Sequence, residues 1–487
     1  MQLKHIAAVA AIAAAAPAFA ATGSLNTLYG VTAARTVYVS GASALSGSLA
    51  AAVGALCQGS SANVRTLNVG GSTSDGRVIV CTTQSAGPAA GVFNGPFAIV
   101  KRDTNGSFDG VGPVISGTTL TTWADVNNCD NVALNCARDT TTARVPNGGL
   151  SDVETAIWRG LNNTGTLSQP VPVPTGITLE SGFAGQGFGV MVSEELYKAM
   201  QTVQKADGRL AGTCVVGDYT PGACQPSIAK SEYAAIVRGD SFSYVANASL
   251  TGKNPSTDAP DVINLCRRVE TSGTQASSNA YFLNNPCGNA DPTFGAVQPK
   301  FVDFATSGSA VAFSSGAGDN VTGNYDDFGG AFGLFEGSGT GDARNCVIRR
   351  NNGNNPNNVN DSLGKFAIGW ISLENAPAAG WKYIKLDGVS PNAYQTAGGW
   401  VVDNDQRRNV VLGRYDAAPE FEMIYPTASS FAGFFTALKT AFSTPAVLNT
   451  RGIYIAPAGS NTHNLFPTQV AKGIRGGNFC APQNLTE

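Results

Sequence analysis

The chain has 487 residues, of which 43% are hydrophobic and 13% carry a charge, and its net charge at pH 7 is −3. This hydrophobic share can fill the cores of two or three domains, which excludes an intrinsically disordered chain. A net charge so close to zero favours neither nucleic acid nor an anionic membrane surface as a partner.

The first twenty residues have the pattern of a cleavable signal peptide. Lys4 precedes an apolar run over residues 6–16, and Ala18 and Ala20 form a small-residue cleavage site. The apolar run is too short to cross a bilayer, and no later segment of the sequence is apolar and long enough to do so. We therefore expect cleavage after Ala20 and a periplasmic or secreted product without a transmembrane segment.

Strand and helix signals alternate along the rest of the chain. Alternating apolar residues predict strands, and longer amphipathic or alanine-rich runs predict helices. The predicted strands are 36–41, 97–103, 187–193 and 364–373, and the predicted helices are 44–57, 194–206 and 226–239. At Ser151, a glutamate three positions later suggests a capping box at the start of a further helix. This alternation favours an α/β fold.

All ten cysteines lie after the signal peptide, which in an exported chain indicates disulfide bonds. Pairing between neighbours in the sequence is the simplest hypothesis. It predicts the bonds Cys57–Cys81, Cys129–Cys136, Cys214–Cys224, Cys266–Cys287 and Cys346–Cys480.

Several kinds of chemistry have little support in the sequence. After cleavage only His463 remains for histidine-based catalysis, and it lies in an Asn/Thr-rich segment typical of an exposed loop. No C-x-x-C pair suggests zinc, so we expect no metal and no cofactor. The glycine-rich segment at 336–342, EGSGTGD, lacks the lysine and the spacing of a phosphate-binding P-loop and is interpreted as a flexible linker. These observations disfavour an enzyme.

The segment RVETSGT at 268–274 combines an arginine with hydroxyl residues ahead of a predicted helix. The first N–H groups of a helix lack partners and face the positive end of its dipole, so they attract anions. Arg268 adds a planar, permanently charged donor suited to a tetrahedral oxyanion, and Ser272 or Thr274 adds a hydroxyl. The alternative is a capped helix start with a surface ion pair.

Other segments, in order along the chain, share this character of a turn with small hydroxyl residues before a helix start. They are SGASAL at 40–45, NGSFDG at 105–110 and LSDVETA at 150–156, and KFAIGWISL and IKLDGVSPN follow the arginine segment. Together with RVETSGT they resemble the motifs of the periplasmic phosphate-binding proteins of ABC importers, within the type II periplasmic binding protein superfamily. The chain departs from the family pattern in having Ala44 and Leu45 where an aromatic residue is common, Glu270 in place of the usual acid and Thr271 in place of the first glycine.

The resemblance implies a ligand site assembled from several loops. The implied phosphate ligands are Ser43, Ala44, Ser107, Asp152, Arg268, Ser272, Gly273 and Thr274. A carboxylate at Asp152 would accept the proton of a phosphate ion and so select phosphate over sulfate. The alternative for Asp152 is that it belongs to the capping-box turn at Ser151.

The resemblance also implies a two-lobed α/β fold with a hinge, a ligand cleft between the lobes, loop insertions and disulfides. Lobe 1 would comprise 21–184 and 399–487, and lobe 2 would comprise 185–398. The implied function is capture of inorganic phosphate or a similar oxyanion for an inner-membrane ABC permease. The alternative is an extracellular structural or surface protein with a lost or altered ligand, and a secreted phosphoesterase is a third hypothesis.

Overall fold

The computed structural model describes residues 22–160, 163–164, 171–238, 242–253, 263–287, 311–314, 319–325, 332–337, 339–355, 364–402, 408–411, 413–442, 447, 453–456, 471–472 and 478–482. The signal peptide prediction and His463 lie outside these residues. Within them, no helix is both long and apolar enough to cross a membrane.

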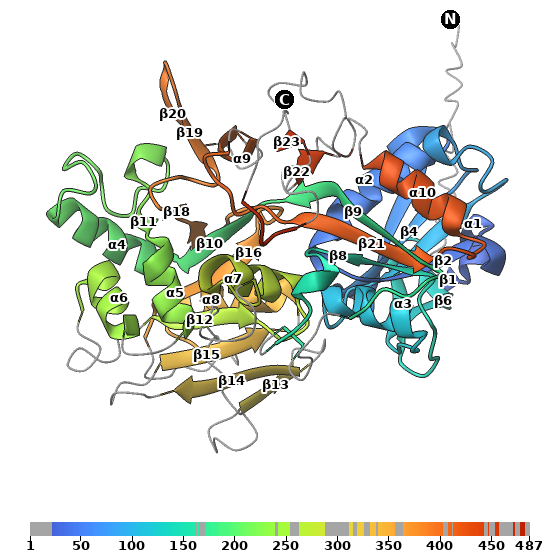
Figure 1. Ribbon diagram of the computed structural model, residues 1–487, viewed down its shortest axis with the longest axis horizontal. Helices are drawn as coiled ribbons and strands as arrows, with labels where there is room; N and C mark the ends of the chain where they lie inside the picture. The colour runs from blue at the N-terminus through green and yellow to red at the C-terminus, as the bar shows by residue number, and fades with distance from the viewer. Residues whose placement is uncertain are drawn as a thin grey trace, which may run out of the picture.

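The chain forms two lobes, each built on its own β-sheet (Figure 1). Among the described residues, the first sheet has the strand order β1-β6-β7-β3-β4-β5-β2-β8-β21-β9-β22-β23. Its strands are β1 (Thr22–Gly23), β2 (Thr36–Gly41), β3 (Val64–Val69), β4 (Ser72–Cys81), β5 (Phe97–Arg102), β6 (Trp123–Asp130), β7 (Asn135–Asp139), β8 (Gly148–Ser151), β9 (Ile177–Gln186), β21 (Glu420–Pro426), β22 (Ile453–Ala456) and β23 (Ala471–Lys472). We call the part built on this sheet lobe 1.

The second sheet, on which lobe 2 is built, has the described order β13-β14-β15-β12-β16-β10-β17. Its strands are β10 (Phe188–Ser193), β12 (Asn264–Arg268), β13 (Val311–Ser314), β14 (Asp319–Tyr325), β15 (Phe332–Gly337), β16 (Ala367–Ser372) and β17 (Trp381–Tyr383). Two small pairs complete the strands: β11 (Ser227–Ile228) with β18 (Lys385–Leu386), and the hairpin β19 (Ala393–Thr396) with β20 (Gly399–Val402).

The helices pack on the faces and at the ends of these sheets (Figure 1). Those described are α1 (Leu25–Tyr29), α2 (Ser46–Leu56), α3 (Gly112–Ser116), α4 (Glu194–Ala206), α5 (Lys230–Arg238), α6 (Phe242–Thr251), α7 (Gly273–Leu283), α8 (Thr340–Asn351), α9 (Arg408–Val411) and α10 (Ala432–Ala441). The α/β class and the two-lobed arrangement expected from the sequence are confirmed. The assignment of residues 21–184, 185–398 and 399–487 to the lobes stays a prediction.

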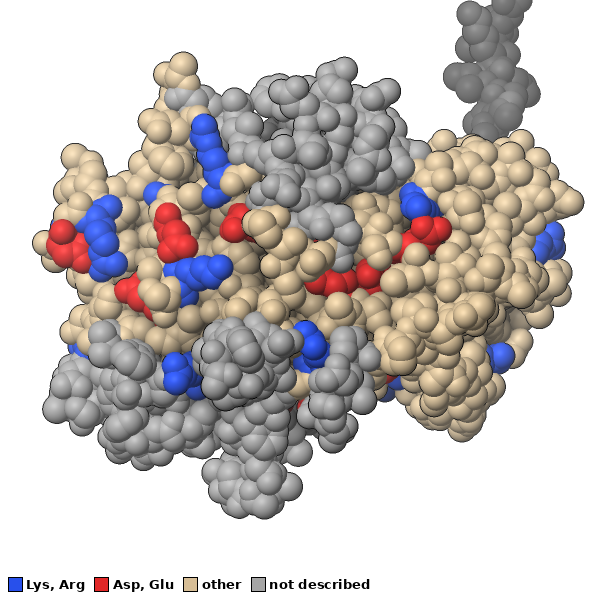
Figure 2. All heavy atoms as spheres, in the orientation of Figure 1, with Lys and Arg blue, Asp and Glu red and all other residues tan. Residues whose placement is uncertain are grey.

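The local sequence explains the best-formed elements. Ser193 caps α4 by accepting a hydrogen bond from Leu196 N, and Glu194 and Glu195 occupy the first turn, where the helix dipole favours negative charge. The predicted strand 36–41 and helix 194–206 coincide with β2 and α4. On the face shown in Figure 2, most of the surface formed by the described residues is uncharged, and acidic and basic side chains lie next to each other near α4.

Lobe 1 buries apolar side chains on both faces of its sheet, and a further cluster joins the two lobes. This cluster, here called the apolar seam, includes Val153 and Trp158 from the segment after β8 and Ala276 and Ala280 from α7, together with Phe479 near the C-terminus. Because α7 follows a strand of lobe 2, the seam buries apolar surface from both lobes at once.

Five disulfides hold the described chain. The predicted bonds Cys57–Cys81, Cys129–Cys136 and Cys214–Cys224 are confirmed. The predicted bonds Cys266–Cys287 and Cys346–Cys480 are wrong, because Cys266 on β12 bonds to Cys346 on α8, and Cys287 bonds to Cys480. Both true bonds join segments that only tertiary packing brings together: α8 packs on β12, and the C-terminal segment lies beside the end of α7.

Candidate functional site

The carboxyl ends of parallel strands from both lobes meet at the lobe junction. In lobe 1, β2 runs parallel to β5 and to β8, and in lobe 2, β12 runs parallel to β15 and to β16. Ligands of open α/β sheets bind beyond the carboxyl ends of such strands. All the predicted site residues lie in the segments that follow β2, β5, β8 and β12, except Arg268, which is the last residue of β12.

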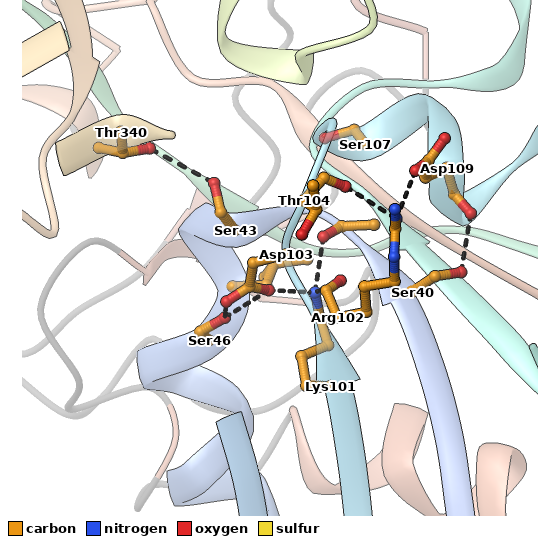
Figure 3. A network of polar contacts seen from close by, with 12 residues as sticks. Ser40, Ser43, Ser46, Lys101, Arg102, Asp103, Thr104, Ser107, Asp109 and Thr340 are labelled. Carbon is orange, nitrogen blue, oxygen red and sulfur yellow. Dashed lines mark hydrogen bonds and ion pairs between the residues drawn. The ribbon is translucent and has the colours of Figure 1, made fainter. Parts of the chain in front are cut away.

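A buried charged group, made of Lys101 and Asp103, lies at the end of β5 in lobe 1. The Lys101 Nζ donates to Asp103 Oδ1 and to Gly41 O, each at 2.6 Å (Figure 3). Ser46, the first residue of α2, donates to both oxygens of Asp103 at 3.0 and 2.8 Å. Burial lowers the pKa of the Lys101 ammonium, and the adjacent Asp103 opposes this. The group ties the start of α2 to the end of β5.

The loop that carries Ser107 is held by a second ion pair. Arg102 Nη1 lies 2.5 Å from Asp109 Oδ2, and Ser40 Oγ donates to Asp109 O at 2.7 Å (Figure 3). Burial raises the pKa of Asp109, and Arg102 counteracts this. The loop is therefore fixed relative to β2, and Ser107 is completely buried.

Asp152 lies beside Ser107, and its carboxyl group is buried. Ser107 Oγ donates to Asp152 Oδ2 at 3.1 Å and accepts from Asp152 N at 3.3 Å. The other oxygen, Oδ1, is buried and has no hydrogen-bond partner among the described residues. Burial raises the pKa of Asp152 to about 6, against the lowering effects of the Ser107 hydrogen bond and of the charges of Arg268 and Lys101. The carboxyl is therefore mainly ionised at pH 7.

The predicted capping box at Ser151 is wrong. Ser151 is the last residue of β8, and its hydroxyl donates to Val153 O instead of capping a helix. Glu154 accepts from Phe479 N at 2.6 Å, a contact with the distant C-terminal segment. No α-helix begins here within the described chain, since a short 3₁₀ turn follows at Thr155–Ile157. Asp152 is thus not part of a helix cap.

The start of α7 brings lobe 2 against Ser107 and Asp152. A Cβ atom added to Gly273 would lie 2.4 Å from Ser107 Oγ and 2.8 Å from Asp152 Cβ, so only glycine fits this approach. Ser272 is the N-cap residue, but its side chain makes no capping hydrogen bond. Thr274 is 2% exposed, and its Oγ1 has no hydrogen-bond partner in the part of the chain that the structure describes.

Arg268 is buried at the end of β12 and is connected to lobe 1 through Thr340. Its Nε donates to Gly337 O at 3.0 Å, and its Nη1 donates to Thr340 Oγ1 at 2.9 Å. The Thr340 hydroxyl lies 3.4 Å from Ser43 Oγ across the junction (Figure 3). Ala44, which follows Ser43 in the sequence, is buried. Burial lowers the pKa of the Arg268 guanidinium to about 10, although nearby carboxyls oppose this, and it remains charged at neutral pH.

The predicted site residues therefore form two adjoining groups. Ser107, Asp152 and Gly273 are in direct proximity, with Ser272 and Thr274 beside them in sequence. Ser43 is joined to Arg268 through Thr340. The charge of Arg268 acts on Asp152, so the two groups share one electrostatic environment.

Two residues of the junction were not predicted. Thr340 lies in the segment interpreted as a flexible linker, and that interpretation is wrong: β15 ends at Gly337 and α8 begins at Thr340, where Asp342 Oδ2 accepts from Gly339 N at 2.8 Å. A small hydroxyl residue at the first position of a helix, shortly after a strand, was the available signal.

Glu374, the second unpredicted residue, follows β16 and reaches lobe 1. Its Oε2 would lie 3.7 Å from a Cβ added to Gly47 on α2, and its Oε1 lies 3.5 Å from Ser372 Oγ. Burial raises the pKa of Glu374 to about 8, against the effect of Arg77 and with a contribution from the nearby Asp152. A single acid after a strand gives no sequence signal of such a position.

Comparisons with known proteins give structural similarities only. A chain from Clostridium perfringens, named "Putative Phosphate ABC Transporter Substrate-Binding Protein with Bound Phosphate", has a TM-score of 0.38 and 11% identity over 85% of this chain and 96% of its own. An ABC-type phosphate transport receptor from Vibrio cholerae has a TM-score of 0.34 and 10% identity over 85% and 96%. PstS from Borrelia burgdorferi has a TM-score of 0.31 and 10% identity over 86% and 98%. No protein-family model and no curated protein sequence matches the chain.

Proposed function

We propose that this protein captures inorganic phosphate or a closely related oxyanion at the lobe junction and releases it unchanged. One observation carries the proposal. Asp152 Oδ1 and Thr274 Oγ1, an acceptor from lobe 1 and a hydroxyl from lobe 2, are both buried and have no hydrogen-bond partners among the described residues. Buried polar atoms without partners are costly, so such a pair is expected where a ligand supplies the missing hydrogen bonds.

The chemistry of the surrounding groups fits a protonated oxyanion. Arg268 supplies positive charge, and the start of α7 supplies N–H groups at the positive end of a helix dipole. An ionised Asp152 repels an anion unless that anion carries a proton that the carboxylate can accept. Phosphate carries such a proton at neutral pH and sulfate does not, so Asp152 would discriminate between them.

The first test is a calorimetric titration of the disulfide-intact protein, stripped of copurified anions, with phosphate and then with sulfate. We expect stoichiometric phosphate binding and no sulfate binding. Replacing Asp152 with Asn should weaken this discrimination. A folded sample that binds neither anion would contradict the proposal.

Thr274→Val makes the test specific to the site. Valine has nearly the shape of threonine, and Thr274 Oγ1 has no partner to lose within the described chain, so the fold should keep its stability. Loss of one hydrogen bond to a charged ligand, worth about 1.5–3 kcal/mol, should weaken phosphate binding roughly 10- to 150-fold. The matched control is Thr202→Val on α4, an exposed position whose hydroxyl donates only to its own helix at Lys198 O. Equal phosphate affinity in both variants would remove Thr274 from the site.

Delivery of the anion to an inner-membrane ABC permease is part of the same proposal. Disulfides persist in oxidising compartments, and the five found here support a periplasmic or secreted protein. Deletion of the gene should then slow growth on limiting phosphate.

A second candidate function is that of an extracellular surface protein whose lobes are held together by its own groups. The Ser43–Thr340–Arg268 contacts favour it, because Thr340 of lobe 2 accepts a hydrogen bond from Arg268 and also contacts Ser43 of lobe 1, so protein groups themselves bridge the junction. Normal growth on limiting phosphate after gene deletion, together with absent phosphate binding, would favour this candidate.

A further inference from the structure

A cavity lies in lobe 2, between α4, β17 and the turn at Gly222–Cys224. Its volume is about 180 Å³, and its lining includes Tyr197, Tyr219, Gln225, Lys382, Tyr383 and Asn392. None of these residues belongs to the candidate phosphate site. For comparison, an engineered protein cavity of about 150 Å³ holds benzene. The cavity can therefore hold a molecule about the size of a six-membered ring.

Gln225, one of the lining residues, carries an acceptor of fixed orientation. Its Nε2 donates to Tyr383 O at 2.9 Å and to Asn392 Oδ1 at 3.1 Å. Because both partners are acceptors, a flipped amide would set oxygen against oxygen, so the orientation of the amide is determined. Gln225 is 6% exposed, and its Oε1 has no hydrogen-bond partner in the described chain. The acceptor is thus buried and oriented, and no described group of the protein donates to it.

Aromatic rings form much of the remaining wall. Tyr197 and Tyr219 meet edge to face with their ring centroids 5.1 Å apart. The Tyr383 hydroxyl donates to Ser372 O and to Asn375 O, both outside the cavity lining, so this residue contributes its ring to the wall. A wall that combines aromatic rings with a few oriented polar groups is typical of a site for a small organic molecule.

The charges around the cavity disfavour an ionic ligand. Lys382 Nζ lies 4.8 Å from the centroid of the Tyr219 ring, where it would repel a cation bound over that ring. The same ammonium pairs with Glu194 at 2.6 Å, so its charge is largely compensated and attracts anions little. An anion without a proton would also leave Gln225 Oε1 without a donor. A neutral ligand that donates hydrogen bonds is therefore favoured.

We propose that this cavity binds a small neutral polyol or monosaccharide through a hydroxyl that donates to Gln225 Oε1. The tyrosine rings pack against the C–H groups of the ligand. The proposal is independent of anion binding at the lobe junction, because the two sites share no residue.

Saturation-transfer NMR with D-glucose and with glycerol as probes tests the proposal on the disulfide-intact protein. We expect a saturable signal from at least one probe and a loss of affinity of tenfold or more in Tyr219→Leu, which removes part of the wall. Tyr219 is only partly buried, so this variant should fold. Its phosphate titration should match that of the parent, which provides a separate check of the fold.

The control is Tyr29→Leu, a partly buried tyrosine on α1 in the other lobe, which should leave the probe signal unchanged. A crystal soaked with the responding probe should show it within hydrogen-bond distance of Gln225 Oε1. Absence of a signal from both probes, equal signals in the parent and Tyr219→Leu, or only water at Oε1 in the soaked crystal would each overturn the proposal.

Discussion

Replacing Asp152 with Asn should stabilise the anion-free protein at neutral pH. The pKa of this buried carboxyl is about 6, compared with an ordinary value of 3.8. Each pKa unit corresponds to about 1.4 kcal/mol, so ionised Asp152 lowers the free energy of unfolding by about 3 kcal/mol relative to its protonated form. Asparagine does not ionise and can still accept the hydrogen bond from Ser107, so it avoids this cost.

Because the pKa of Asp152 is higher in the folded than in the unfolded state, its contribution to the free energy of unfolding decreases as the pH rises. The folded state binds the Asp152 proton more tightly than the unfolded state, so the stabilisation from this group is complete below about pH 4 and is lost as the pH rises through about 6. The stabilities of Asp152→Asn and the parent should therefore be similar at pH 4. At pH 8 the variant should exceed the parent by about 3 kcal/mol.

Urea denaturation of anion-stripped samples at pH 4, 6 and 8, followed by circular dichroism, measures this difference. Asp207→Asn is the control, because Asp207 is 41% exposed and its partner Arg209 lowers its pKa, the opposite direction. It should give no gain at pH 8. If Asp152→Asn were equal to or less stable than the parent at pH 8, Asp152 would not be a desolvated carboxyl retained at a cost in stability.

Two further changes test the packing of the junction and the disulfide framework. Gly273→Ala places a methyl group against Ser107 and the opposite lobe. Overpacking costs about 1–3 kcal/mol, and because this cost falls where the lobes meet around the proposed ligand, phosphate affinity should fall about 5- to 150-fold. Unchanged affinity in a calorimetric titration would contradict the tight approach of the two lobes. Replacing both Cys266 and Cys346 with Ala removes a bond between residues 80 apart in sequence, which should lower the free energy of unfolding by about 4 kcal/mol in urea titrations. A loss below about 1 kcal/mol would show that this crosslink constrains the unfolded chain little.

Elements set by local sequence were predictable, and contacts set by tertiary packing were not. The helix α4 is specified by its Ser193 cap, its acidic first turn and its apolar periodicity, all adjacent in sequence. By contrast, Glu154 accepts from Phe479 N, more than three hundred residues away, so a local capping-box pattern at Ser151 was misleading. The Cys266–Cys346 bond likewise depends on α8 packing on β12, which no spacing of cysteines reveals.

The same distinction between local sequence and tertiary packing applies to the residues of the candidate site. The segment around Arg268 was identifiable because one stretch of sequence holds an arginine, hydroxyl residues and a helix start. Thr340 and Glu374 were missed because each is a single polar residue after a strand, and only the meeting of the two lobes gives it a role. The position of the junction depends on which strands run parallel, and the strand directions are a property of the folded sheets.

The apolar seam bears on how quickly a bound anion could exchange. Trp158 and Ala276 are completely buried, and separating the lobes would expose them to water. Because exposing apolar surface costs roughly 25 cal/mol per Å², opening would have to cross a barrier even with no ligand present. Dissociation of the anion would then be limited by how often the lobes part, and its residence time would exceed what the strength of the ionic contacts alone suggests.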